Sequence, residues 1–299
     1  MRAFHSDRFV PELPPGHRFP IQKYQLIREQ LLHQGILTED QLEESTPVAE
    51  KDILRVHTKA YWQGLHQLSL EARAVRKIGF PLTERLVDRS RRSCQGTFRA
   101  AEWALEHGVG MNIAGGTHHA YAGHGEGFCV LNDIAISALS LLATQKVTQI
   151  LIIDLDVHQG NGNAVIFQGD PRVFTFSMHG AKNYPLRKEL SDLDVGLPNF
   201  TRDAAYLQQL QAILPKLIEQ VKPDLIYYQA GVDVLETDKL GKLSLSRQGC
   251  KERDQIVLSL AHRLQIPLCL CMGGGYSHRV ADTVDAHVNT FRVVQEIYG

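Results

Sequence analysis

The segment from Ile150 to Gly162 carries the residue types best suited to chemistry in this chain. It reads Ile-Leu-Ile-Ile-Asp-Leu-Asp-Val-His-Gln-Gly-Asn-Gly, so an apolar run leads directly into alternating carboxylate and imidazole side chains. Because successive side chains of extended backbone point to opposite faces, we expect Asp154, Asp156 and His158 on one side. A carboxylate and an imidazole at this spacing can bind one zinc ion, with a second carboxylate beside them. The alternative is a buried strand followed by a polar turn.

A pair of adjacent histidines, His118 and His119, follows the apolar run 109–114 and two glycines. Adjacent imidazoles can serve as general base, general acid and electrostatic partner. The loop 125–128 reads Gly-Glu-Gly-Phe, and its glycines allow the backbone to approach a ligand closely. A histidine pair alone is more often part of a polar loop, but its place beyond a strand end favours a catalytic role.

Asp233 and Tyr276 each follow an apolar run in the same way. Asp233 could complete an Asp-His-Asp ligand set with Asp156 and His158, which leaves the fourth zinc position open for water or a substrate carbonyl. Tyr276 follows three glycines, and its hydroxyl could donate a hydrogen bond to a developing oxyanion. Taken singly, Asp233 would be a turn-capping residue and Tyr276 part of an ordinary loop.

Apolar runs and helical periodicity alternate along the chain. We expect strands at 109–114, 149–154, 173–177, 225–230 and 267–272. We expect helices at 22–33, in pieces over 47–78, and at 83–107, 129–143, 203–221, 247–264 and 279–298. This alternation predicts a three-layer αβα fold with a central, mostly parallel sheet, whose ligand crevice lies beyond the carboxyl ends of the strands. No linker or repeat divides the sequence, so residues 1–299 should form one domain.

The charges of the chain nearly balance, with 32 Lys and Arg against 33 Asp and Glu. No overall field therefore attracts nucleic acid or an anionic membrane. We interpret the four arginines between 85 and 92 as a solvated helix face. The amino-terminal residues lack the apolar core of a signal peptide and no later run could span a bilayer, so we expect a soluble cytoplasmic protein. The five cysteines form no Cys-x-x-Cys pair, which disfavours a disulfide framework.

Together these segments resemble the histone deacetylase family of zinc amidohydrolases, which share the arginase-type α/β fold. The resemblance rests on motifs in a fixed order: His118-His119, Gly127-Phe128-Cys129, Asn132-Asp133, Asp154-x-Asp156-x-His158, Gly160-x-Gly162, Asp233 and Gly274-Gly275-Tyr276. The runs 112–119 and 158–162 look most like class IV deacetylases and their bacterial relatives. The resemblance implies that residues 1–299 are a single zinc-dependent catalytic domain.

The resemblance also implies two metal sites. Asp156, His158 and Asp233 would bind Zn²⁺, although iron or cobalt can occupy such a set as well. A structural K⁺ or Na⁺ would lie beside it, as in many relatives. That ion would be surrounded by Asp154, Asp156, His158, Ser177 and Met178.

Five residues take catalytic roles by the same resemblance. His119 would be the principal general base and then general acid, His118 an electrostatic partner, and Tyr276 the oxyanion donor. Asp154 would orient His118 through a hydrogen bond. Many relatives carry Asp where Asn161 stands, paired with the second histidine. A neutral Asn161 should therefore raise the basicity of His119 less than a carboxylate would.

The resemblance places the substrate in a narrow tunnel. Phe128 would form one wall, the Gly127 carbonyl would accept the substrate amide proton, and Tyr184 would form the opposite wall. The segment 179–198 that carries Tyr184 matches the better-known classes poorly.

The preferred hypothesis is therefore a zinc-dependent hydrolase of N-acyl-lysine in proteins or peptides, with no direct nucleic-acid or membrane partner. The nearest alternatives are a hydrolase of small acylated amines such as acetylpolyamines, or of long-chain acyl groups. The arginase branch of the fold needs a second metal site and is disfavoured by His118-His119 and Tyr276. A catalytically silent module that binds acyl-lysine is a further alternative. The sequence leaves the chain length of the acyl group, the physiological substrate and the oligomeric state open.

Overall fold

The computed structural model describes residues 1–299 and contains one central sheet of eight strands. The strands run parallel throughout, in the order β2-β1-β3-β8-β7-β4-β5-β6. Their bounds are Ala3–His5 (β1), Leu42–Glu44 (β2), Val109–Asn112 (β3), Ile150–Asp154 (β4), Val173–Gly180 (β5), Leu193–Leu197 (β6), Leu225–Gln229 (β7) and Leu268–Cys271 (β8). The predicted parallel sheet is confirmed.

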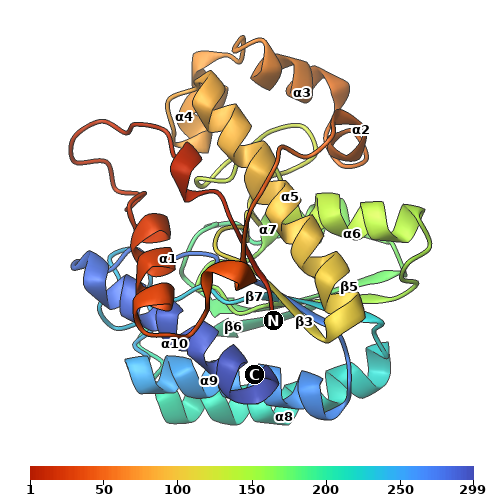
Figure 1. Cartoon of the computed structure of the whole chain (residues 1–299), viewed down its shortest axis with the longest axis vertical. Coiled ribbons are helices and arrows are strands. Elements are labelled where there is room, and N and C mark those ends of the chain that lie inside the picture. The colour runs from red at the N-terminus through yellow and green to blue at the C-terminus, as the bar shows by residue number, and fades with distance from the viewer.

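Helices cover both faces of this sheet and give the three layers predicted from the sequence (Figure 1). One layer consists of α1 (Lys23–His33), α8 (Asp203–Val221), α9 (Arg247–Arg263) and α10 (Val280–Tyr298). The other layer is built on α5 (Glu84–His107) and α6 (Asp133–Ala143), with the shorter α2 (Glu50–Ile53), α3 (Lys59–His66), α4 (Ala72–Ile78) and α7 (Asn161–Ile166) on that side. Two 3-10 turns span Asp7–Phe9 and Glu39–Gln41. No helix is both long and apolar enough to cross a bilayer.

The five predicted strands are those at the centre of the sheet. Of the three missed strands, β2 and β6 are its edges and β1 lies next to β2. Helix α6 begins at Asp133, later than the predicted start at residue 129. The Asn132 side chain accepts a hydrogen bond from the Ala135 N–H at 2.9 Å, which caps the helix there. Helix α7 was not among the predicted helices.

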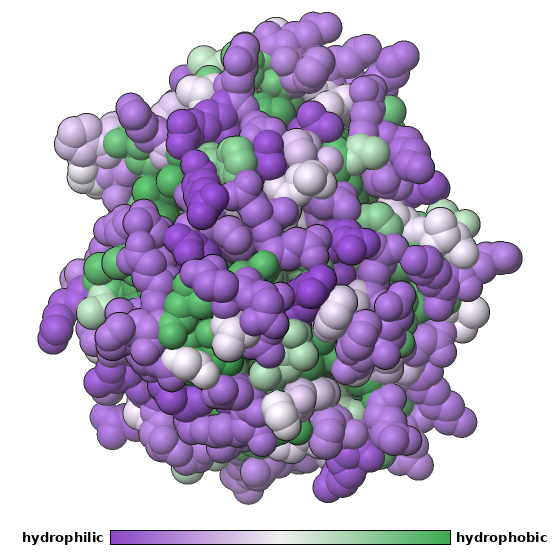
Figure 2. All heavy atoms as spheres, viewed as in Figure 1, coloured by the Kyte–Doolittle hydropathy of each residue, from purple (hydrophilic) through white to green (hydrophobic).

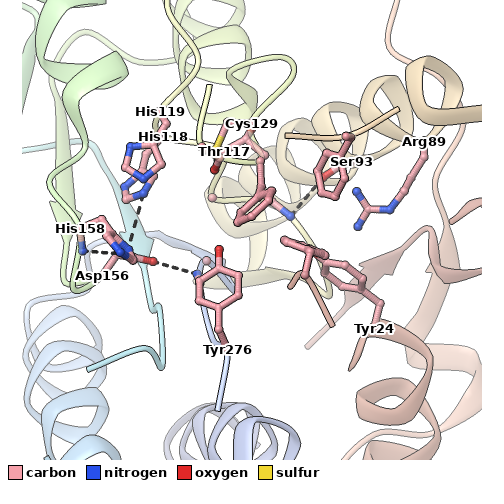
Figure 3. A pocket seen from close by; sticks show the side chains of 18 residues that line it. Tyr24, Arg89, Ser93, Thr117, His118, His119, Cys129, Asp156, His158 and Tyr276 are labelled. Atoms are coloured by element: carbon pink, nitrogen blue, oxygen red, sulfur yellow. Dashed lines mark hydrogen bonds and ion pairs between the residues drawn. The ribbon is translucent and has the colours of Figure 1, made fainter. Parts of the chain in front are cut away.

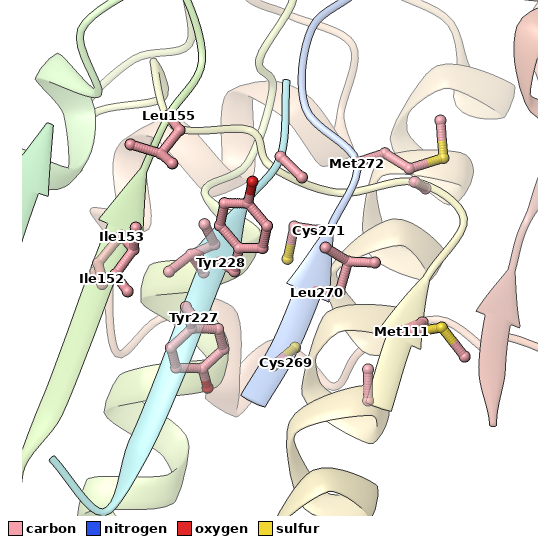
Figure 4. Close-up of a cluster of buried hydrophobic side chains, with 14 of the residues drawn as sticks. Met111, Ile152, Ile153, Leu155, Tyr227, Tyr228, Cys269, Leu270, Cys271 and Met272 are labelled. Carbon is pink, nitrogen blue, oxygen red and sulfur yellow. The ribbon is translucent and has the colours of Figure 1, made fainter. Parts of the chain in front are cut away.

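A single cluster of 78 buried apolar residues fills the space between the sheet and the helices. Cys269 and Cys271 of β8 pack in this core between strands β3 and β7 (Figure 4). All five cysteines are free and buried. Outside, the apolar areas on the face seen in Figure 2 are small and separated by hydrophilic side chains. The main force that holds the layers together is therefore burial of this one core.

The interpretation of the arginine cluster on α5 as a solvated face is wrong. Arg85 donates to the Val10 carbonyl at 2.7 Å and Arg91 donates to the Val48 carbonyl at 2.9 Å. Arg92 donates to the Ser45 carbonyl, and Arg89 is buried with its guanidinium 4.3 Å from the Tyr24 ring centroid. The amino-terminal segment packs across α5, and its carbonyls find their donors in these arginines.

A buried arginine on α9 joins the carboxyl ends of two central strands. Arg253 has no exposed surface and donates to the Leu155 carbonyl beyond β4 and to the Gly231 carbonyl beyond β7, the latter at 2.6 Å. Asp254 compensates its charge at 2.8 Å and also accepts hydrogen bonds from two hydroxyls. The two segments that leave β4 and β7 are thus both hydrogen-bonded to the guanidinium of Arg253.

We predict that Arg253→Met lowers the free energy of unfolding by about 3–5 kcal/mol, because Asp254 is left buried without its counter-charge. The matched control is Arg263→Met at the exposed end of the same helix. This substitution should change the free energy of unfolding by less than about 0.5 kcal/mol. Urea titration followed by circular dichroism measures both. If Arg253→Met unfolds at the same urea concentration as the wild type, the hydrogen bonds of Arg253 do not stabilise the fold.

Candidate active site

The candidate residues converge at the carboxyl edge of the sheet, where the consecutive strands β3, β8, β7 and β4 end. His118 and His119 follow β3, Tyr276 follows β8, Asp233 follows β7, and the Asp156 segment follows β4. Strands β3 and β4 succeed each other in the chain but are separated in the sheet by β8 and β7. The connections from β3 and β4 lead to α6 and α7 in one layer, whereas those from β7 and β8 lead to α9 and α10 in the other. Connections that leave neighbouring strands toward opposite faces open a crevice, as in other open parallel sheets.

Asp156, His158 and Asp233 form one buried cluster whose ligand atoms all lie within 4.8 Å of one another. The His158 Nδ1 atom lies 3.0 Å from Asp156 Oδ1 and 3.1 Å from Asp233 Oδ2. Strand β4 ends at Asp154, so both ligands from this segment lie in the loop beyond it. Leu155 and Val157 between them are fully buried in the hydrophobic core.

The charges of this cluster call for a cation. Burial, and then the charge of Asp156, raise the pKa of Asp233 to about 7. Burial alone would lower the pKa of His158, but its hydrogen bonds to the two carboxylates raise it to about 10. The cluster thus holds a proton among buried carboxylates that repel each other, and a divalent cation would compensate the same charges. The donor set of two carboxylates and one imidazole suits zinc.

Backbone groups hold the other oxygen of each carboxylate. The Gly274 N–H donates to Asp156 Oδ2 at 2.8 Å, and the Val157 N–H donates to Asp233 Oδ1 at 2.9 Å. A Cβ atom at Gly274 would collide with both carboxylates. Glycine is therefore required at Gly274, and Asp156 Oδ1 and Asp233 Oδ2 are left facing His158.

The two histidines lie beside this cluster, on a loop that Asp133 fixes. The Asp133 carboxylate accepts hydrogen bonds from the Gly116 and Thr117 N–H groups at 2.9 and 2.7 Å. The next residue, His118, pairs through Nδ1 with Asp154 Oδ2 at 2.6 Å. Burial alone would lower the pKa of His118, but the carboxylates of Asp154 and Asp156 raise it to about 9. His118 is therefore held as a cation.

His119 is held in the opposite state. Its Nδ1 lies 2.6 Å from Asn161 Oδ1, while Asn161 Nδ2 donates to Glu126 Oε1 at 2.8 Å. Because a carboxylate only accepts, Glu126 orients the Asn161 amide, so that His119 Nδ1 carries the proton and Nε2 has a free lone pair. Burial, and then the neighbouring imidazoles His118 and His158, hold the pKa of His119 well below its ordinary value. His119 is thus a neutral imidazole.

Tyr276 completes the group, with its hydroxyl pointing into the space beside Asp156 and the two histidines (Figure 3). Burial, and then the charges of Asp233 and Asp156, raise its pKa well above the usual value, so the hydroxyl keeps its proton. The Tyr276 N–H donates to Asp238 Oδ2 at 2.6 Å, which anchors the glycine loop. The hydroxyl is therefore available as a donor.

Two aromatic residues stand at the mouth of the pocket. Phe128 and Tyr184 line it together with His119, His158 and Tyr276. The Phe128 and Tyr276 ring centroids lie 5.9 Å apart, and the Tyr184 ring meets that of His119 edge-on at 5.1 Å.

Backbone contacts hold the loop that carries Phe128. The Gly127 and Phe128 N–H groups donate to the Lys77 and Ile78 carbonyls at the end of α4. Gly127 has φ +57°, and a Cβ there would lie 2.7 Å from the His119 ring. Glycine therefore lets this loop approach the histidine.

The residues predicted to surround a monovalent cation also lie together. Asp154 of β4 is paired with Ser177 of β5, and Met178 follows Ser177 in the same strand. All three are buried. Binding of K⁺ or Na⁺ there stays a prediction.

Sequence reasoning missed three residues that support the site. Glu126 is 4% exposed and accepts hydrogen bonds from Asn161 and from the Tyr184 hydroxyl, the latter at 2.6 Å. Lys23 is fully buried and donates to the Gly273 carbonyl at 3.2 Å, and Asp238 anchors the following loop. Glu126 carried a signal, since it is a charged residue between two glycines. Nothing in the sequence distinguishes Lys23 from a surface lysine.

Comparison with known proteins agrees with this geometry. The family profile of the histone deacetylase domain matches residues 17–291. Histone deacetylase 2 of Arabidopsis thaliana is 30% identical over 282 residues, which cover 90% of this chain and 73% of the relative. An uncharacterized protein of Picosynechococcus sp. is 42% identical over 296 residues, covering 99% of this chain and 98% of the relative.

Among solved structures, the HD domain of HDA15 superposes with a TM-score of 0.83 at 20% identity. The match covers 99% of this chain and 88% of that domain, and it shows that the fold is shared. With the family profile across most of its length, the chain belongs to the histone deacetylase family and carries a deacetylase-type hydrolase domain.

Proposed function

We propose that the protein is a zinc-dependent hydrolase that cleaves the amide of N-acyl-lysine. The observation that carries this proposal is the cluster of Asp156, His158 and Asp233 beside a neutral imidazole, His119, and a protonated phenol, Tyr276. These are the groups that amide hydrolysis by activated water requires. Residues 1–299 would act as one catalytic domain, with class IV enzymes as the nearest class.

Each residue has a role that follows from its protonation state. Zinc held by the cluster would supply a Lewis acid and lower the pKa of water. His119 Nε2 takes a proton from the water that attacks the amide carbon, and His119 then gives this proton to the lysine nitrogen as the carbon–nitrogen bond breaks. The Tyr276 hydroxyl donates to the oxygen that becomes negative, and the charge of His118 stabilises the same region.

The pocket walls suit the uncharged side chain of an acyl-lysine. Its methylene groups would lie between the rings of Phe128 and Tyr184, and the Gly127 carbonyl would accept its amide proton. The Glu126 hydrogen bond to the Tyr184 hydroxyl holds one wall in place.

Metal binding tests the proposed function directly. The protein should bind one zinc ion per chain, and a chelator should abolish hydrolysis of acetyl-, butyryl- and octanoyl-lysine peptides until zinc is restored. Asp233→Asn should weaken zinc binding at least about 100-fold, because it removes a charged ligand. The exposed Asp40→Asn is the control and should bind as the wild type does. Hydrolysis that survives complete chelation would refute the metal mechanism.

Replacing the proposed oxyanion donor separates catalysis from binding. In Tyr276→Phe, kcat should fall about 10²–10³-fold while a fluorescent acyl-lysine peptide still binds, because only the developing charge loses its donor. Tyr298→Phe, remote from the pocket, should keep wild-type kcat. A wild type that binds the peptide and never turns it over would instead indicate a silent binding module.

The Glu126 contact predicts the effect of restoring the carboxylate that many relatives have. Asn161→Asp would set two carboxylates against each other across the present 2.8 Å contact, so it should lower both kcat and the free energy of unfolding, the latter by about 1–3 kcal/mol. Adding Glu126→Gln supplies a donor and should recover most of both losses. A double-mutant cycle measures this coupling, and purely additive losses would show that the contact does not orient Asn161.

A further inference from the structure

The mouth of the pocket carries one sign of charge. Its lining contains five cationic side chains and no Asp or Glu: Arg18, Arg76, Lys77, Lys182 and Lys242. The whole chain has a net charge of only −1, so this concentration of cations is local. They come from the amino-terminal loop, from α4 and from the loops beyond β5 and β7, so they approach the mouth from separate parts of the chain.

Four of these cations are free to meet a ligand. Lys77 lies 2.5 Å from Glu126 and is neutralised by it. Arg18, Arg76 and Lys182 are exposed and form no salt bridge. Lys242 is exposed as well, and its ammonium group donates only to the Lys182 carbonyl, which leaves its charge uncompensated. Charges of one sign around a concave mouth raise the local concentration of ligands of the opposite sign.

Resting on the proposed function, we propose that this mouth selects acyl-lysines that are flanked by acidic residues, so that the substrates are acidic segments of proteins. An extended peptide advances roughly 3.3–3.6 Å per residue, which brings the residues next to the acyl-lysine to the mouth itself. Carboxylates at those positions would pair with Arg18, Arg76 and Lys182. A basic tail or an acetylated polyamine would bring ammonium groups against the same cations.

The mixed character of the mouth favours a polypeptide over a nucleic acid. Leu186 is 92% exposed beside the cations, and Leu240 lines the mouth with it. Apolar side chains next to cations suit a peptide that alternates acidic and apolar residues. Binding of single strands relies instead on aromatic platforms along a basic groove, and the aromatic walls here face into the pocket.

The test compares three peptides that differ only beside a central acetyl-lysine, with a second set bearing octanoyl-lysine. The flanks are Asp and Glu, the uncharged Asn and Gln, or Lys and Arg. With the zinc-loaded protein, kcat/KM should be about tenfold higher for acidic than for uncharged flanks and lowest for basic flanks. The preference should shrink toward none at about 0.5 M salt, where charges are screened over a few ångströms.

Variants assign the preference to the mouth. Arg76→Gln/Lys182→Gln should lower kcat/KM for the acidic peptide about fivefold through KM, with the uncharged peptide unchanged, because rim contacts are the same in the bound and transition states. The control Lys51→Gln/Lys216→Gln removes the same charge at exposed positions away from the mouth and should have no effect.

Each remaining outcome is decisive. Equal kcat/KM for all flanks, or equal loss in the control variant, overturns the selection while leaving the hydrolase intact. If no peptide is cleaved, the proposed function fails, and the flank preference is then read from peptide binding by fluorescence anisotropy, where equal affinities overturn it. Binding of a thymidine oligonucleotide with no flank preference among peptides would overturn it in favour of a nucleic-acid partner.

Discussion

The buried guanidinium of Arg253 holds in place the two segments from which the metal-binding cluster comes. It donates to carbonyls of Leu155 and Gly231, each close in sequence to a carboxylate of the cluster. Asp154, Asp156 and Asp233 gather within one buried edge of the sheet, and like charges in such a place repel strongly. Because the Leu155 and Gly231 carbonyls are hydrogen-bonded to the Arg253 guanidinium, the backbone cannot move the carboxylates apart to relieve this repulsion. The site geometry therefore depends on an interaction on the far side of the loops, outside the pocket.

The two histidines acquire different charges because their hydrogen-bond partners differ. Asp154 contacts His118 directly and holds it as a cation. At His119 the hydrogen bond goes to the neutral amide of Asn161, and the carboxylate of Glu126 stands behind that amide. The amide transmits orientation without transmitting charge, so His119 receives a defined tautomer and stays neutral. The departure from the family pattern at position 161 is thus accompanied by a carboxylate from another loop.

The sequence predicts those parts of the structure that depend on local patterns, and it does not predict contacts between segments distant in sequence. Central strands such as β4 and β7 are buried on both faces, so they are continuous apolar runs and were predicted. Strand β6 alternates partly exposed side chains at the sheet edge and gave no such signal. The candidate site residues carry their own chemistry, which allowed their selection. The burial of Arg89 and the contact of Glu126 with Asn161 depend on segments distant in sequence, and no local pattern encodes them.

In the proposed reaction the pocket takes up a neutral side chain, while the cations at the mouth act on the charges around it. An acyl-lysine side chain is neutral and fits between Phe128 and Tyr184, so it brings no charge that the cationic mouth would oppose. Hydrolysis would change this, because the product lysine becomes an ammonium ion that has to leave past the cations at the mouth, Arg76, Lys182 and Lys242. Acidic flanks attract the substrate before the reaction, and the new ammonium weakens the attraction after it. The same cations thus favour both arrival of the acyl-lysine and departure of the lysine.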